Sequence, residues 1–197
     1  MILFMKLKLF FALFIVWILF IKEDTVTYGE GVVAAQTPIQ EKVDETMPFS
    51  FKDYTITPLE KFSIEARVLS KEKYSFDKGA ELSPIDLALG WGRMSDEAIL
   101  KNIDISQSGR WYHWQTAKFP IPRREIETHS ANMHMIPADK TVEEELRSIR
   151  KGEVVTIEGY LVRVDGKDGY TWISSLSRND TGAHACEVVF VKNIDRH

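Results

Sequence analysis

The densest group of polar side chains in the sequence lies in residues 125–134. Its His129 and His134 could act as bases or metal ligands, and Asn132 could donate and accept hydrogen bonds. The two histidines are five residues apart, so a strand would send them to opposite faces and a helix would also separate them. One regular element therefore does not aim both at one metal ion, and the spacing matches no known metal-binding motif.

A second polar group lies in residues 178–187. It includes His184 and Cys186, which alternation places on one face of the last predicted strand, where they could join a histidine of the first group as zinc ligands. The simpler interpretation places Cys186 in the core, because it shares that face with Val188 and Phe190. We predict no catalytic residue, metal or cofactor, and we retain one candidate polar cluster. It comprises His129, Asn132, His134, Arg178, Asp180, His184, Cys186 and Glu187.

Nucleophilic catalysis would need a serine or Cys186 beside a histidine and a carboxylate. Ser174, Ser175 and Ser177 are available, but no G-x-S-x-G elbow or phosphate-binding glycine loop is present. Serines in such a segment are more often ordinary strand and turn residues. Arg178 has a structural interpretation as well, as the partner of a nearby carboxylate such as Asp180.

Aromatic residues near arginines form a third group. They could stack nucleic-acid bases, but they more often fill a core or a protein interface. Without the three lysines of residues 1–22, the chain has 22 bases against 29 acids, a charge of −7, which disfavours nucleic acid. The aromatic residues are Trp91, Trp111, Tyr112, Trp114 and Trp172, and the arginines are Arg110, Arg123 and Arg124.

Strands are expected to position most of these residues. Alternating apolar and polar residues predict a strand over 62–69, and a shorter strand precedes it at 54–57. Residues 77–92 are rich in Gly and Pro and are predicted to form an ordered connection. Further strands are predicted over 110–114, 125–136 and 185–192, and a hairpin joins 153–164 to 170–177, with a bend at Gly159.

Two short helices are predicted. Ser95 is a favourable N-cap for a helix that ends near Ile103. Thr141 and Glu144 form a T-x-x-E capping box, and the helix they begin ends before Gly152. Its apolar face comprises Val142, Leu146 and Ile149.

The element pattern predicts a mainly β fold with two short helices (α+β), built as a small OB-like β-barrel that follows an N-terminal transmembrane helix. The order of a helix, a strand bent at glycine and a hairpin resembles the second half of OB folds, which is an analogy that implies no activity. We place a transmembrane signal anchor at residues 1–22, a tether at 23–50 and the β-rich soluble domain at 51–197.

Residues 9–21 contain no charge or strongly polar group and follow Lys6 and Lys8. A segment of about 20 residues can span the membrane if the lysines reach the headgroups. A cleaved signal peptide is the alternative, but the nearest small-residue site precedes Gln36, beyond several acids. Basic residues before the apolar run predict a cytoplasmic N-terminus and a periplasmic C-terminal domain.

Residues 129–138 and 174–187 resemble a group of exported or membrane-anchored bacterial proteins with no assigned activity, and the resemblance covers about residues 55–192. It implies a single-pass protein of the bacterial inner membrane. We therefore predict a binding or assembly module whose partner is another envelope protein, with no nucleic acid. The alternatives are a small hydrolase or metal-dependent enzyme using His129, His134, His184 and Cys186, and an oligonucleotide-binding OB-like domain.

Overall fold

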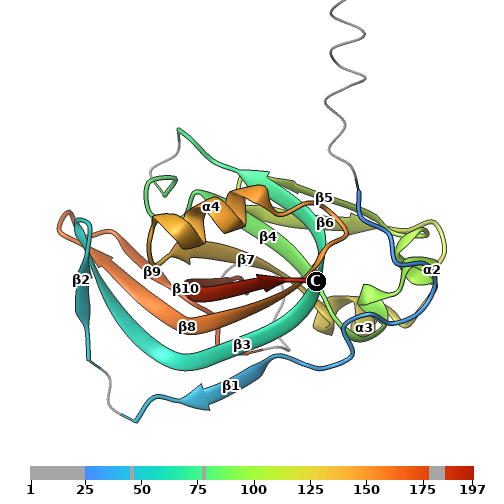
Figure 1. Cartoon of the computed structure of the whole chain (residues 1–197), viewed down its shortest axis with the longest axis horizontal. Helices are drawn as coiled ribbons and strands as arrows, with labels where there is room; N and C mark the ends of the chain where they lie inside the picture. Colours follow the sequence, from blue (N-terminus) through green and yellow to red (C-terminus); the bar gives the residue numbers. More distant parts are fainter. Residues whose placement is uncertain (1–24, 45–46, 77–78, 178–184) are drawn as a thin grey trace, which may run out of the picture.

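The computed structural model describes residues 25–44, 47–76, 79–177 and 185–197, which form a mainly β structure (Figure 1). Five strands make up most of one curved sheet. They are β3 (Tyr54–Lys73), β4 (Ile85–Gly90), β7 (Ser130–Pro137), β8 (Val154–Gly166) and β10 (Glu187–Arg196). They lie in the order β3, β4, β7, β10, β8, and β8 pairs again with β3, so the sheet closes on itself.

All neighbouring pairs in this closed sheet are antiparallel except β7 and β10, which are parallel. The long strand β3 pairs with both β4 and β8, and these pairings shift register after Val68 and after Pro58 respectively. Its first part pairs with β8 and its last part pairs with β4. The predicted strands over 54–57 and 62–69 are therefore parts of one continuous strand.

The core lies inside the closed sheet and follows the period of two that strands impose. Each of the five strands contributes alternate apolar side chains to it, and α4 (Lys140–Ser148) covers it with Val142 and Leu146. The inward residues of the strands include Phe62, Ile64, Leu87, Met133, Met135, Val155, Ile157 and Val189. The apolar face predicted for α4 is confirmed, whereas its N-cap is Asp139, whose side chain accepts a hydrogen bond from the Val142 N–H group.

Strand β4 lies where an ordered connection was predicted, so that prediction was wrong for residues 85–90. All six residues of β4 are buried. A strand covered on both faces loses the alternation of polar and apolar residues from which strands are recognised. The Gly and Pro residues around it also made the segment resemble a connection.

The connection from β4 to β7 contains five short elements. They are the 3₁₀ turn η1 (Gly92–Ser95), α2 (Glu97–Leu100), the hairpin strands β5 (Asp104–Ser108) and β6 (Trp111–Gln115), and α3 (Arg123–Thr128). Asp96, and not the predicted Ser95, caps α2. The strand predicted over 125–136 is shorter, because α3 occupies its first residues. The described residues thus contain three α-helices where two were expected.

Residues 23–50, predicted as a tether, contact the domain from Val26 onward. The Val26 N–H group donates to the Lys151 carbonyl oxygen at 2.9 Å, and the buried Ala34 N–H group donates to Ser95 Oγ. Strand β1 (Ile39–Lys42) pairs with β3, as does β2 (Phe49–Phe51). The predicted anchor at residues 1–22 lies outside the described residues. In the described part of the chain, no helix is long and apolar enough to cross a membrane.

The predicted C-terminal hairpin joins β8 to the short strand β9 (Thr171–Ile173). The predicted bend at Gly159 is explained by the irregular pairing of β8 with β10, which shifts register between Val191 and Asn193. A Cβ atom on Gly159 would lie 2.0 Å from the Phe190 carbonyl oxygen. Only glycine therefore permits this close approach of the two strands.

Candidate functional site

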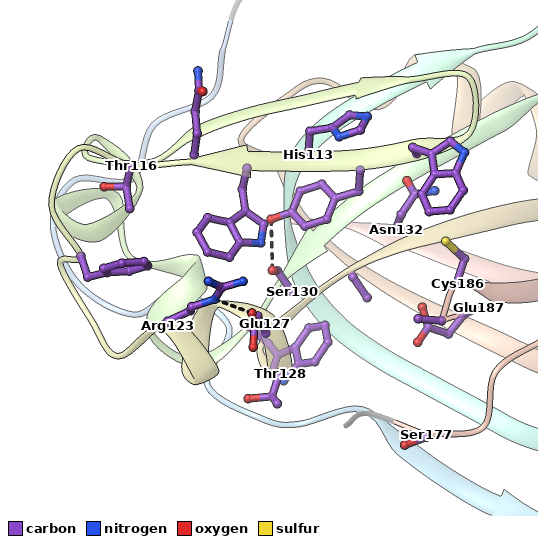
Figure 2. Close-up of a pocket in the computed structure, with 18 residues that line it drawn as sticks. His113, Thr116, Arg123, Glu127, Thr128, Ser130, Asn132, Ser177, Cys186 and Glu187 are labelled. Atoms are coloured by element: carbon purple, nitrogen blue, oxygen red, sulfur yellow. Dashed lines mark hydrogen bonds and ion pairs between the residues drawn. The ribbon is translucent and has the colours of Figure 1, made fainter. Parts of the chain in front are cut away.

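A cleft with a volume of about 600 Å³ lies between the β5–β6 hairpin, α3 and the first residues of β7 and β10 (Figure 2). Ligand sites usually combine aromatic walls with a few polar groups in a cleft of this size. Its aromatic lining residues are Trp91, Trp111, Tyr112, Trp114 and Phe119, with His113 at the rim. Its polar lining residues include Arg123, Glu127, Ser130, Asn132, Cys186 and Glu187.

The hairpin that forms one wall turns at Gly109 and Arg110, which both have positive φ angles of 56° and 69°. Two such residues in a two-residue loop form the type I′ turn, whose twist matches that of the strands on either side. Register then follows from the turn, with Ser108 opposite Trp111 and Gln107 opposite Tyr112. The aromatic residues of β6 are thereby fixed along the cleft.

Arg110 links the tip of the hairpin to β4 and to the residues just before it. Its Nη1 atom donates to Asp86 Oδ1 at 3.0 Å, and its Nη2 atom donates to the Ser83 carbonyl oxygen at 3.0 Å. The guanidinium also lies over the Tyr74 ring, 4.0 Å from the centroid, and the Arg110 N–H group donates to the Tyr74 hydroxyl. Because Asp86 is fully buried, this ion pair is shielded from water. Removing one of its partners should therefore destabilise the fold more than breaking an exposed surface pair would.

Asn132 connects the hairpin to the start of β7. Its Oδ1 atom accepts a hydrogen bond from Gln107 Nε2 at 2.6 Å, and its Nδ2 atom donates to the Arg110 carbonyl oxygen at 3.2 Å. The side chain is buried beneath the hairpin and borders the cleft. Asn132 was predicted as a polar site residue, and the structure places it at this end of the cleft, where it holds the hairpin in position.

Tyr112 forms the second link between the hairpin and β7. Its hydroxyl donates to Ser130 Oγ at 3.1 Å, a contact drawn as a dashed line in Figure 2. Burial raises the pKa of the Tyr112 hydroxyl to about 12, although the hydrogen bond with Ser130 opposes the change. The hydroxyl is therefore a stable hydrogen-bond donor at neutral pH and does not serve as a base.

Helix α3 brings a charged pair to the opposite wall. Arg123 Nε donates to Glu127 Oε1 at 2.8 Å, and the Arg123 guanidinium carbon lies 5.9 Å from the centroid of the Trp114 ring. The i,i+4 spacing places both side chains on one helix face. The pair gives the cleft a hydrogen-bond donor and an acceptor, and the two opposite charges cancel.

His129 lies at the C-terminal end of α3, away from the other predicted histidine. Its ring faces Trp91 at 6.3 Å between centroids, and its Nδ1 atom lies 3.0 Å from Thr128 Oγ1. Gly92 makes room for the ring, because a Cβ atom at that position would lie 2.9 Å from His129 Cδ2. These contacts give His129 a packing role at the end of the helix.

His134 occupies a different environment, on the side of the sheet that faces away from the core. It lies directly opposite Asp86 across β4 and β7, and its Nδ1 atom is 2.9 Å from Asp86 Oδ2. The Trp172 ring covers it at 4.6 Å between centroids. His134 is buried beneath β9 and does not line the cleft, so the structure does not bring it together with His129.

Cys186 and Glu187 border the cleft at the start of β10, beside Asn132 (Figure 2). The Cys186 side chain is half-buried, whereas Glu187 is almost completely buried. Cys186 is therefore less enclosed than the core position that the pattern predicted. The predicted site residues Arg178, Asp180 and His184 lie outside the described residues. Across the part of the chain that is described, no group of three His, Cys, Asp or Glu residues could hold a metal ion.

Several residues of the site were missed from the sequence. Asp86 lies in an apolar run, and Gln107 and Phe119 belong to no motif, so no local signal connects them to Arg110, Asn132 or the cleft. The aromatic residues of β6 were recognised as an interface or core group, and they line the cleft together with Arg123.

Comparisons with protein families, with curated proteins and with solved structures find no match for this chain.

Proposed function

We propose that this protein is a membrane-anchored binding module of the OB type, which displays its aromatic cleft in the periplasm and binds a segment of another envelope protein there. The observation that carries the proposal is the cleft itself. Aromatic side chains of β6, together with Trp91 and Phe119, line it, and a separate set of partly buried hydrogen bonds holds the hairpin in place. Preorganisation of this kind reduces the entropy cost of binding.

The OB-like part of the proposal is supported by the closed order of five strands and by the position of α4 between β7 and β8. Such barrels commonly bind ligands on one outer sheet face and on the adjoining loops. In this chain that face carries Asp86, Asn132 and His134, and the hairpin and Trp172 cover it. The cleft at the margin of the hairpin remains accessible beside this face.

Charge favours a protein partner over nucleic acid. The cleft has one lining arginine, Arg123, against the two glutamates Glu127 and Glu187. A groove that binds phosphates needs an excess of positive charge. Half-exposed aromatic side chains such as Trp111 and Phe119 are instead typical anchor points of protein interfaces.

The membrane part of the proposal rests on residues 1–22, whose length and flanking lysines suit a single span with the N-terminus in the cytoplasm. Carbonate washing should leave the full chain in the membrane fraction. Protease added to spheroplasts should degrade the domain. A mature N-terminus at Gln36, found by protein sequencing, would overturn the anchor and leave the exported binding module.

Photocrosslinking in intact bacterial cells tests the binding part. The photoreactive residue p-benzoylphenylalanine replaces Phe119 at the cleft in one strain. In a control strain it replaces Phe76, which is fully exposed outside the cleft. We expect a discrete crosslinked protein from position 119 and none from position 76. Equal products at the two positions, or none at either, would overturn the proposal.

A further inference from the structure

Strand β6 borders the cleft with its edge. The lining includes six consecutive residues, Trp111 to Thr116. Successive side chains of a strand point to opposite faces, so one face would contribute only alternate residues. A cleft that touches every residue therefore runs along the edge, where backbone N–H and C=O groups are accessible.

The turn determines which of these backbone groups face the cleft. In a two-residue type I′ hairpin the residues next to the turn form a hydrogen-bonded pair, and such pairs then alternate along the strands. The register makes Ser108–Trp111, Ser106–His113 and Asp104–Gln115 the hydrogen-bonded pairs. The backbone N–H and C=O groups of Tyr112 and Trp114 consequently point away from β5.

These outward groups have no hydrogen-bond partner among the described residues. Exposed edge strands are normally protected by lysine, proline, a bulge or a covering segment. The sequence of β6, WYHWQ, contains no lysine or proline, and its pairing with β5 is regular. Across the cleft, β10 begins to pair with β7 only at Met133, so within the described residues no strand pairs with that edge of residues 130–132.

We propose that the edge of β6 binds an extended peptide segment of a partner protein by strand addition. This inference deepens the proposed function and rests on it. An added strand would receive main-chain hydrogen bonds from Tyr112 and Trp114, while alternate side chains would contact Trp111 and Phe119. The five residues of β6 span about 17 Å, enough for a segment of four or five residues. The charge of −7 on residues 23–197 favours a neutral or basic segment.

The probe is a peptide selected from a random heptapeptide phage library against the full chain in nanodiscs. Amide hydrogen exchange, measured residue by residue by NMR, then reports the pairing. In the free protein the amides of Tyr112 and Trp114 should exchange quickly, whereas those of Trp111, His113 and Gln115 should be protected by β5. The peptide should slow exchange at Tyr112 and Trp114 by at least tenfold.

A matched pair of variants tests the backbone contact separately. Both Trp114→Pro and Trp114→Val remove the indole ring, but only proline removes the outward N–H group, at a position where an edge strand tolerates it. We expect the peptide to bind W114P about tenfold more weakly than W114V, the effect of one lost hydrogen bond. Equal affinities would overturn the proposal, and the exchange pattern of the wild-type protein decides the question if W114P does not fold.

Other results of the exchange and binding experiments would lead to different conclusions. If a ligand shifts Trp111 and Phe119 resonances without protecting Tyr112 and Trp114, strand addition is wrong and the cleft remains the binding site. If those two amides are already protected in the dilute free protein, the chain itself fills the edge. Protection that appears only with a concentration-dependent dimer assigns the edge to a second copy. No peptide binding at the cleft would overturn the inference, whereas the crosslinking at position 119 tests the proposed function independently.

Discussion

The guanidinium of Arg110 and the carboxylate of Asp86 form a hydrogen-bonded ion pair of 3.0 Å between the tip of the hairpin and the second residue of β4. Asp86 is fully buried, and His134 is its second polar neighbour. Together with the contacts of Asn132 and Tyr112, the pair positions the β5–β6 hairpin, and it therefore contributes to the shape of the cleft.

Replacing Arg110 with methionine should lower the free energy of unfolding by about 2–4 kcal/mol, because it leaves a buried carboxylate without its cation. Urea unfolding measures the loss. The double variant R110M/D86L should recover part of it, since the buried charge is gone. Lys140→Met, which removes an exposed i,i+4 pair with Glu144, is the control and should cost less than about 0.5 kcal/mol. An equally small loss for R110M would show that the pair does not hold the hairpin.

Glu153 should make the folded state sensitive to acid. Burial opposes ionisation of this side chain, but hydrogen bonds from Arg196 and from the backbone and guanidinium of Arg150 lower its pKa to about 2. A pKa below that of the unfolded chain stabilises the folded state above about pH 4.5. As the pH falls from 4.5 to 2, roughly 3 kcal/mol of stability should disappear.

Urea unfolding of the wild-type protein and Glu153→Gln between pH 2 and 6 checks this prediction. The wild-type protein should be more stable at pH 6, and the difference should shrink toward pH 2, because glutamine does not titrate. A difference that stays constant across this range would contradict the assignment of the acid sensitivity to Glu153.

Gly159→Ala should destabilise the protein by at least about 3 kcal/mol or prevent folding, because the new Cβ atom would overlap the Phe190 carbonyl oxygen. Soluble yield and the urea midpoint report the effect. Lys192→Ala, at an exposed position of β10 beside the same irregular pairing, should change stability by less than about 1 kcal/mol. Similar behaviour of the two variants would show that the strands can separate at little cost.

Trp111 and Phe119 should contribute little to folding, because their side chains are 49% and 50% exposed. Replacing either with alanine should lower the free energy of unfolding by less than about 1 kcal/mol. Trp91 also lines the cleft but is 1% exposed, so Trp91→Ala should cost about 3–5 kcal/mol. Thermal unfolding separates the two cases. A large loss for Trp111→Ala would assign that side chain to the core and weaken its role in binding.

Elements with local signals could be predicted from the sequence. The apolar face of α4, the hairpin of β8 and β9 and the alternating part of β3 each depend on residues a few positions apart. Strand β4 could not be predicted, because burial on both faces removes its alternation. Asp96 caps α2 one residue after the expected Ser95, and Asp139 caps α4 two residues before the expected Thr141, since nearby residues compete for the same N-cap.

The site was harder to predict because its contacts join distant residues. The sequence identified Asn132, Cys186 and Glu187 as candidates, and all three border the cleft. It grouped His129 with His134, although one packs at the end of α3 and the other pairs with Asp86. That difference follows from α3 ending at Thr128, which places His129 before the strand that carries His134.

The hydrogen bond between Val26 and Lys151 limits how far the domain could reach from a membrane. If residues 1–22 span the bilayer, the four residue steps from Lys22 to Val26 cover at most about 14 Å. The domain would then stay next to the lipid headgroups and could not move to the far side of the periplasm. Its partners would then present the extended segment within one domain's reach of the same membrane.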